Sequence, residues 1–486
     1  MPHIFPRSGL ALATLLASLA LSASVTVQAD NVPDYQQGAQ WLEQRLNLVE
    51  AGQQARNLIF FLGDGMSITT LTAARIYQGQ MRGGSGEENF LSFEQFPWSG
   101  LVKTYNTNQQ TPDSAGTMSA LMTGVKTRAG VISIGPGQEL ATCAGSQDHW
   151  QPTLLEIAAG NGLATGVVTT TRITHATPAA TYSHSPDRDW ENDAVLTAEA
   201  RQNGCVDIAR QLLEQGFVQG LDLAMGGGLA NFTLASAGGQ RQDEDLTQRY
   251  QQQYPQGQLL RSRDDLLNMN ANTPILGLFA SSHMDYGIDH DQQSAPQQPS
   301  LEDMTFAAIR VMQQKTLAQP QGYVLVIEGG RIDHAHHAGQ ATRALADTLE
   351  FADAISLADR LTNDNDTLIV VTADHSHTLT LAGYQKRGAP ILGMATSQQQ
   401  TYTTLGYANG PGAHHHANDE AMPTAHPDYH QAALGPLPDE THGSDDVAVH
   451  AKGPGSQWFH GQLEQNTLFH LMASALQLPA TQEKQP

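Results

Sequence analysis

The stretch Tyr323-Val-Leu-Val-Ile-Glu328-Gly-Gly-Arg-Ile-Asp333-His334-Ala-His336-His337 decides the fold and indicates a site beside it. Its first five residues are apolar and predict a short buried strand. Asp333 and His337 are four residues apart, so on one helical turn their Cβ atoms lie about 5–6 Å apart. A carboxylate and an imidazole placed in this way can bind one zinc ion, and Glu328 at the end of the strand can serve a second metal. The alternative, for residues 328–337 taken alone, is a solvated polar loop.

A second apolar segment is followed by the same kinds of ligand. Residues 368–372, Leu-Ile-Val-Val-Thr, predict a buried strand, and Asp374, His375 and His377 follow it directly. Asp374 and His375 offer an oxygen and a nitrogen ligand. His377 is either a further ligand or a partner that orients a carboxylate. A lone histidine is more often a core or surface residue, but the repeated pattern favours a metal site.

A third apolar segment, residues 57–62, ends in Gly63-Asp64-Gly65-Met66. Ligands of open α/β sheets gather outside the carboxyl ends of the strands. We therefore expect Asp64, Glu328 and Asp374 to share one edge of a sheet. Taken alone, Gly-Asp-Gly is also an ordinary turn sequence.

A nucleophile candidate lies in Pro112-Asp113-Ser114-Ala-Gly-Thr117, before a predicted helix that begins near Ser114 and ends at Gly124. Helix N-termini bind anions through free N–H groups and the helix dipole. The alternative is that Asp113 or Ser114 only caps the helix. The metal clusters favour Ser114 as a nucleophile, because zinc can hold a hydroxyl group as an alkoxide near neutral pH.

Strands and helices alternate along most of the chain, which predicts a doubly wound α/β fold. Residues 389–439 break this pattern and are rich in Gly, Pro, Gln and His, while the polar residues 243–258 predict a surface helix or loop. The predicted strands are residues 58–62, 167–171, 221–225, 323–327 and 368–372, and the predicted helices start at Ile68, near Ser114 and at about Gln340, the last ending at about Leu361.

Six motifs in this order resemble those of the alkaline phosphatase family, most closely the subgroup that includes the animal enzymes. The resemblance extends from about Arg56 to about Leu476. The motifs are Phe61-Leu-Gly-Asp-Gly-Met66, Pro112-Asp-Ser-Ala-Gly-Thr117, Thr169-Thr-Thr-Arg-Ile-Thr-His-Ala-Thr-Pro178, Glu328-Gly-Gly-Arg-Ile-Asp-His-Ala-His-His337, Thr372-Ala-Asp-His-Ser-His377 and Thr441-His-Gly443.

The resemblance implies a three-layer α/β/α sandwich around a large, mostly parallel sheet. It also implies a crown-like insertion at about residues 389–439, often at a dimer interface, and hence a homodimer. The implied activity is hydrolysis of phosphate monoesters of broad specificity, with inorganic phosphate as product, through a phosphoserine on Ser114.

The same resemblance implies two zinc ions and one magnesium ion, and assigns their ligands. Arg188 is implied to bind phosphate oxygens, because a guanidinium group can bond two of them at once. We expect Arg172, which lies nearer the predicted strand, to be structural. The implied ligands are Asp333, His337 and His442 for the first zinc, Asp64, Asp374 and His375 with Ser114 for the second, and Asp64, Thr177 and Glu328 for magnesium.

Two positions beside the implied metals differ from some family members. His175 stands where certain bacterial enzymes have Asp, and His334 stands where they have Lys. We expect weaker magnesium binding for this reason, and a third site that accepts zinc. Animal relatives also hold calcium, but Ala280 replaces the acidic residue expected after Phe279, which argues against calcium in this chain.

Other functions are compatible with some of these residues. The same scaffold supports phosphodiesterases and sulfatases, which usually differ in the nucleophile. A secreted zinc-binding protein without catalytic activity is a different class of protein with the same ligands. A zinc peptidase is disfavoured because the chain contains no His-Glu-x-x-His motif.

Residues 1–29 predict a secretory signal, with Arg7, an apolar core at residues 10–21 and Val27-Gln-Ala29 as a cleavage site. We expect residues 30–486 to form a single domain without a membrane span, in the periplasm or secreted. Such a compartment permits a disulfide between Cys143 and Cys205, which the family resemblance implies; the alternative is two free thiols.

The formal net charge is −23, from 48 acidic and 25 basic residues. Because the sequence has no basic stripe, we expect no nucleic-acid binding. An acidic composition with few lysines indicates a salt-adapted surface, because salt screens the repulsion between like charges.

Overall fold

The computed structural model describes residues 54–292, 297–318, 321–397, 400–414 and 422–479, together with five positions between residues 35 and 42. The predicted signal segment, residues 1–29, lies outside the described residues.

A large sheet runs through the described part of the chain, with β1 (Asn57–Gly63) between β7 (Tyr323–Gly329) and β8 (Thr367–Ala373). All three strands are buried along their whole length and run parallel, which suits their apolar, β-branched sequences. Only β16 runs antiparallel to the other strands described in this sheet. The strand order is β17 (Gly461–Glu464), β2 (Trp98–Lys103), β16 (Val447–Lys452), β8, β1, β7, β3 (Ala164–Arg172), β4 (Leu221–Gly227), β6 (Ile275–Leu278) and β5 (Gln258–Leu260).

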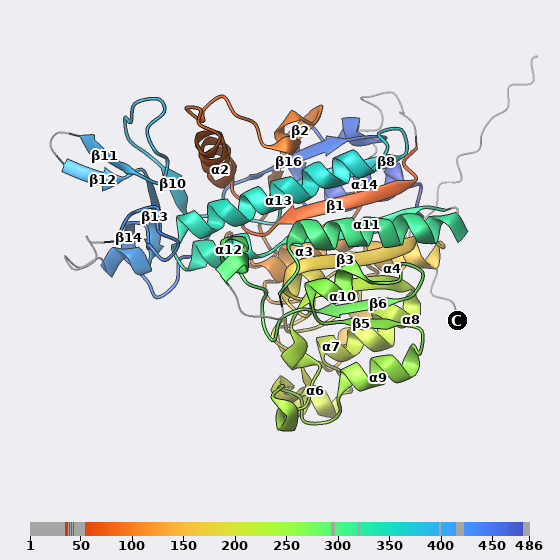
Figure 1. Cartoon of the computed structure of the whole chain (residues 1–486). Coiled ribbons are helices and arrows are strands. Elements are labelled where there is room, and N and C mark those ends of the chain that lie inside the picture. Colours follow the sequence, from red (N-terminus) through yellow and green to blue (C-terminus); the bar gives the residue numbers. More distant parts are fainter. Residues whose placement is uncertain are drawn as a thin grey trace, which may run out of the picture.

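Helices cover both faces of this sheet (Figure 1). On one face, α13 (Ala341–Leu361) contacts both α2 (Ile68–Met81) and α11 (Leu301–Ala318). On the other, α3 (Ser114–Thr123) contacts both α4 (Leu154–Gly160) and α14 (Thr467–Ala475). The predicted three-layer α/β/α sandwich around a mostly parallel sheet is confirmed.

Two small sheets lie apart from the large one, beyond the ends of α2 and α13 (Figure 1, blue, on the left). One contains β10 (Leu379–Leu381), β13 (Leu405–Gly410) and β14 (Ala433–Pro436), and the other contains β11 (Met394–Ser397) and β12 (Gln400–Thr403). The first of these strands starts before residue 389, where the composition of the sequence changes. The domain limits stay a prediction.

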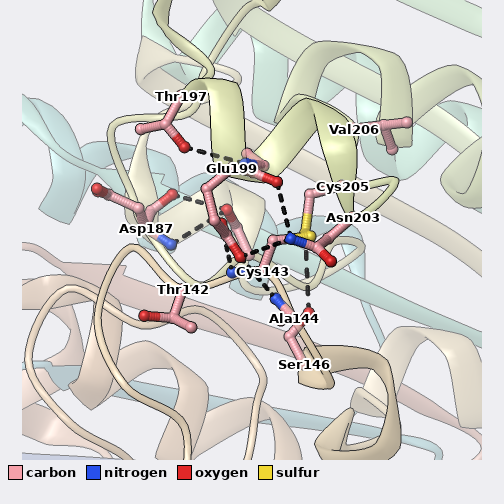
Figure 2. The surroundings of a disulfide bond; sticks show 12 residues. Thr142, Cys143, Ala144, Ser146, Asp187, Thr197, Glu199, Asn203, Cys205 and Val206 are labelled. Atoms are coloured by element: carbon pink, nitrogen blue, oxygen red, sulfur yellow. Dashed lines mark hydrogen bonds between the residues drawn. A yellow bond between two sulfur atoms is a disulfide. The ribbon is translucent and has the colours of Figure 1, made fainter.

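A disulfide joins Cys143 to Cys205, as the sequence predicts, across a separation of 62 residues and with the Cα atoms 5.9 Å apart. Figure 2 shows the carboxylate of Glu199 beside the bridge, where it accepts hydrogen bonds from the backbone N–H groups of Cys143 and Ala144, both 3.0 Å long. Trp190 packs with the bridge in a small cluster separate from the main core. The bridge therefore ties two loops together where little apolar surface is buried.

Removing the bridge should lower stability. The Cys143→Ser, Cys205→Ser double variant should lose about 4 kcal/mol of unfolding free energy, the loop-entropy value for a closed loop of this length. Denaturant titration of the variant beside the wild type measures this difference. A wild-type midpoint that a reductant leaves unchanged would contradict it.

Candidate active site

The register of the central strands brings three acidic residues to one edge of the sheet. Gly63 lies opposite Gly329 on one side and Ala373 on the other, so Asp64 and Asp374 both follow the ends of adjacent strands. Glu328 lies opposite Leu62, one step inside that edge. All three carboxyl groups are fully buried. The sequence predicted this meeting, and the structure brings the three residues together.

Gly65 allows the chain to turn tightly at this edge. Its φ is +67°, and a Cβ there would lie 2.4 Å from the ring of His377. Its N–H donates to Asp374 Oδ1 over 3.1 Å. A side chain at this position would therefore displace the imidazole and strain the backbone.

Helix α3 starts at Ser114 and presents its hydroxyl group to the acidic edge. Asp113 caps the helix by accepting from Gly116 N–H, and the helix ends at Gly124 in the left-handed conformation. Ser114 Oγ lies 3.1 Å from His375 Nε2 and 3.4 Å from Asp64 Oδ1. Of the two residues that could cap the helix, Asp113 is the cap, and the Ser114 hydroxyl group faces the site.

The first ligand set contains Asp333, His337 and His442. Asp333 and His337 lie on one face of the short helix α12 (Arg331–His337), and His442 lies on β15 (His442–Gly443). Asp333 Oδ1 is 3.3 Å from Nε2 of each of the two histidines, and these two Nε2 atoms are 3.0 Å apart.

The two imidazoles of this set point lone pairs at each other. His337 Nδ1 donates to the carbonyl oxygen of Glu440 over 2.5 Å, and His442 Nδ1 donates to that of Pro112 over 2.7 Å. A carbonyl oxygen only accepts, so both protons are on Nδ1 and both Nε2 atoms carry lone pairs. Their close approach to a carboxylate calls for a cation between them, so this set fits a zinc ion.

The second ligand set contains Asp64, Asp374 and His375. His375 Nδ1 donates to the carbonyl oxygen of Ser376, and its Nε2 lies 3.3 Å from both Asp64 Oδ1 and Asp374 Oδ2. Burial holds the pKa of His375 well below its usual value, so the ring is neutral. A lone pair facing two carboxylates fits a second cation beside Ser114.

The third ligand set contains Asp64, Thr177 and Glu328. His175 lies beside it, since ligand atoms of Asp64, His175 and Glu328 lie within 4.8 Å of one another. Thr177 Oγ1 lies 3.5 Å from Asp64 Oδ2. Glu328 Oε1 is buried without a hydrogen-bond partner among the described residues, and so is His175 Nδ1. Buried polar atoms without partners are rare, so this group also fits a cation.

Burial and mutual repulsion raise the pKa values of the acidic groups. Burial raises the pKa of Glu328 to about 7. Burial, followed by the charge of Asp374, raises that of Asp64 well above its usual value.

Arg188 reaches the same edge and is held there by Asp113. Its Nη1 donates to Asp113 Oδ2 over 3.0 Å, and its Nη2 lies 3.2 Å from His175 Nε2. Burial opposes its charge, but Asp113 raises the pKa, so Arg188 stays a cation. Asp113 thus caps helix α3 and orients the arginine, a second role that the sequence did not reveal.

Arg172 contacts residues outside the three ligand sets. It forms an ion pair with Glu191 over 2.6 Å and contacts His283. The ring of His283 lies 4.1 Å from that of His334, which lies 5.5 Å from His175. His283, which no motif contains, therefore adds a third ring to this pair.

His377 and Glu440 form a further layer around the first ligand set. His377 Nε2 lies 2.7 Å from Asp333 Oδ1, and its Nδ1 lies 2.5 Å from Glu440 Oε2. Burial opposes protonation of His377, but Glu440 and Asp333 raise its pKa to about 10. Of the two alternatives for His377, the contacts favour the partner that orients a carboxylate. Sequence reasoning missed Glu440, since its neighbours in the chain give it no distinguishing pattern.

Comparison with known proteins identifies the family. Residues 55–478 match the sequence profile of the family described as alkaline phosphatase. The chain belongs to the alkaline phosphatase family. Its sequence is 41% identical to the tissue-nonspecific isozyme of alkaline phosphatase from Gallus gallus, over 96% of this chain and 93% of that protein. The corresponding isozyme from Homo sapiens is 38% identical, over 94% and 90%.

Solved structures agree with this assignment. The alkaline phosphatase of Thermus thermophilus superimposes with a TM-score of 0.64 at 26% identity, over 88% of this chain and 92% of that chain. The enzyme of the Antarctic bacterium TAB5 superimposes with a TM-score of 0.61 at 22% identity, over 88% and 99%, which shows a shared fold. The predicted resemblance to the family and to its animal subgroup is confirmed.

The contribution of Glu328 to the stability of the metal-free protein should fall as the pH rises. The folded chain keeps a proton on Glu328 up to a pH of about 7, whereas the unfolded chain releases it near 4.5. Since the folded state then binds more protons at this group, its contribution to the unfolding free energy falls through this window. Bound dications remove the repulsion, so zinc and magnesium should stabilise the protein more at pH 8 than at pH 5.

Thermal unfolding of chelator-treated protein at the two pH values, with and without the cations, measures this effect. Glu328→Gln is the matched control, because it removes this titrating group and leaves the others in place. A difference in unfolding temperature between the metal-free wild type and Glu328→Gln that is the same at both pH values would contradict the expectation.

Proposed function

We propose that this alkaline phosphatase hydrolyses phosphate monoesters of broad specificity through a phosphoserine on Ser114. The observation that carries the proposal is the position of the Ser114 hydroxyl group. It begins helix α3, 3.1 Å from His375 Nε2 and 3.4 Å from Asp64 Oδ1, next to the residue that holds Arg188. An anion placed there meets a helix N-terminus, a guanidinium group and an oxygen nucleophile.

We assign two zinc ions and one magnesium ion to the three ligand sets. When bound, these cations supply Lewis-acid stabilisation of charge on the phosphoryl oxygens and lower the pKa of bound hydroxyl groups. Nitrogen-containing sets suit zinc and oxygen-rich sets suit magnesium. His175 beside the third set offers a nitrogen where a carboxylate would favour magnesium, which supports a weaker preference for that ion. The assignment is Asp333, His337 and His442 for the first zinc, Asp64, Asp374 and His375 for the second, and Asp64, Thr177 and Glu328 for magnesium.

The residues of the chain divide the work of the reaction. Arg188 binds two phosphoryl oxygens and is held for this by Asp113. Ser114 Oγ attacks phosphorus in line with the leaving oxygen, so the bond from phosphorus to that oxygen breaks and the alcohol departs. Water then attacks the phosphoserine and releases inorganic phosphate from Ser114. His377 keeps Asp333 oriented. These contacts bind the phosphoryl group and none of them binds the alcohol, which supports broad specificity for the alcohol.

Phosphodiesterase and sulfatase activities on the same scaffold are the alternative, together with a zinc-binding protein without catalytic activity. Ser114 and Arg188 together favour monoesters, since the arginine pairs with oxygens that a diester would esterify. Rates on p-nitrophenyl phosphate, on its diester and on p-nitrophenyl sulfate separate the three enzymes. Trapping of phosphoserine separates the phosphatase from a zinc-binding protein without catalytic activity.

Ser114→Ala should lose turnover while it keeps phosphate. We expect the rate to fall at least about a thousand-fold, because the covalent route is lost. Metal content and inorganic phosphate binding should persist, because their ligands remain. Ser119→Ala is the matched control, since it removes another buried hydroxyl from the same helix, one that contacts only backbone groups. Acid trapping of labelled phosphate, with mapping of the modified peptide, is the measurement. Full activity of Ser114→Ala would reject the nucleophile.

We further propose that residues 1–29 direct export to the periplasm or out of the cell. Residues 30–486 then form one domain, and two copies of it form a homodimer. The disulfide between Cys143 and Cys205 supports an oxidising compartment. No helix within the described ranges is long and apolar enough to cross a membrane.

The acidic surface should make the protein salt-tolerant. With a net charge of −23, screening by salt relieves the repulsion between like charges in the folded state. We expect a higher thermal unfolding temperature in about 2 M sodium chloride, where the Debye length is under about 3 Å. An unfolding temperature that stays the same or falls would argue against salt adaptation.

A further inference from the structure

Glu440 contacts two histidines at the first ligand set. It is almost fully buried, and it precedes His442 by two positions. Its carboxylate Oε2 lies 2.5 Å from His377 Nδ1, and its carbonyl oxygen accepts from His337 Nδ1 over 2.5 Å. Its backbone N–H donates to the carbonyl oxygen of His337 over 2.8 Å. One residue therefore orients two imidazole rings that meet at Asp333.

The carboxylate of Glu440 is bonded at both oxygens. Oε1 accepts from the backbone N–H of Thr378 over 2.6 Å and from its hydroxyl group over 2.5 Å, while Oε2 faces His377. His377, held by Glu440, in turn orients the carboxylate of Asp333, because its Nε2 lies 2.7 Å from Asp333 Oδ1. A shorter or uncharged side chain could not make all of these contacts, so the position requires this length and this charge.

Strand β13 of the three-stranded sheet holds the segment around Glu440. Asn409 exchanges two hydrogen bonds with Thr441, each 3.0 Å long. Ala408 N–H donates to Thr378 Oγ1 over 3.2 Å, next to the bond from Thr378 to Glu440. A Cβ on Gly410 would meet Cβ of Glu440 at 3.0 Å, so the strand packs closely against it.

We propose that Glu440 is the positioning residue of the Asp333–His337–His442 set, and that β13 anchors it there. The inference rests on the proposed function for the identity of the cation. Rings and carboxylates that are free to rotate bind metal less well, because binding must then order them. Partners that orient metal ligands in this way typically affect metal affinity by about 10- to 100-fold.

Metal affinity tests the proposal directly, independently of activity. Zinc competition against a chromophoric chelator measures the affinity of each site. Glu440→Ala should bind zinc at the Asp333–His337–His442 set about 10- to 100-fold less tightly than the wild type does. The visible spectrum of cobalt-loaded protein should change as well, because it reports the geometry of the ligands. The second set, around His375, should keep its affinity, since Glu440 contacts none of its members.

Two further variants should weaken zinc binding by smaller factors than Glu440→Ala does. Glu440→Gln keeps an oxygen for Thr378 but loses the charge that faces His377, so its affinity should fall between wild type and Glu440→Ala. Asn409→Ala leaves Glu440 in place and removes only the link from β13 to Thr441. It should weaken zinc binding in the same direction by a smaller factor, and wild-type affinity in this variant would reject the anchoring role of β13.

Asp207→Asn is the matched control for the loss of a buried carboxylate. Asp207 is 1% exposed and pairs with the buried Arg241 over 2.7 Å, away from all three ligand sets. It should destabilise the metal-free protein without changing zinc affinity. An equal loss of affinity in Asp207→Asn would show that the effect is general instability, and would overturn the proposal.

Wild-type zinc affinity and an unchanged cobalt spectrum in Glu440→Ala would also overturn it. The proposed function stands or falls separately, on phosphoserine trapping in the wild type. If the wild type binds zinc but forms no phosphoserine, while Glu440→Ala weakens zinc binding, then the hydrolase mechanism fails and the positioning role holds.

Discussion

Repulsion between buried carboxylates and imidazole lone pairs is the constraint on which the rest of this structure depends. His337 and His442 hold their Nε2 atoms 3.0 Å apart, both beside Asp333. Asp64 and Asp374 face the lone pair of His375. Without a cation, each of these contacts costs free energy, because a lone pair is buried beside another lone pair or beside a carboxylate. The fold must therefore hold its ligands in place before the metals arrive.

Parallel strands in register provide this rigidity. Asp64 and Asp374 leave adjacent strands at the same level, with Glu328 one step inside. Since hydrogen bonds run along the whole of β1 on both sides, these residues cannot shift along the sheet without breaking its pairing. The Ser114 hydroxyl group is placed by a capped helix whose first residue faces this edge. The cap residue, Asp113, also orients Arg188.

The small three-stranded sheet gives the first ligand set its support from outside the sandwich. Its strand β13 bonds to Thr441 through Asn409, and Tyr407 bonds to His336 over 2.9 Å. His442 itself pairs with His377 across β15 and β9 (Ser376–His377). The small sheet is thus connected through hydrogen bonds to neighbours of the first ligand set, although it contributes no described strand to the large sheet. This arrangement explains why a segment of irregular composition can matter for a site that lies beside it.

Local patterns along the chain determined much of this protein. Apolar runs followed by Asp, His or Glu predicted the central strands, their shared edge and most of the ligands, because strand period and ligand chemistry are properties of neighbouring residues. The helix that begins at Ser114 and ends at Gly124 was equally visible, since caps are local. His442, Thr177 and Arg188 came only from resemblance to the family. The three-stranded sheet begins at Leu379, ten residues before the composition of the sequence changes at residue 389.

Only the tertiary structure decided how these residues are held. The bond from His442 to Pro112 joins positions 330 residues apart, and that from His377 to Glu440 joins positions 63 apart. Contacts of this kind cannot be predicted from patterns of neighbouring residues, because the two partners lie far apart in the sequence. Short sequence motifs therefore determine which residue types the ligand sets contain. The orientation of these residues depends on packing between segments that meet only after folding.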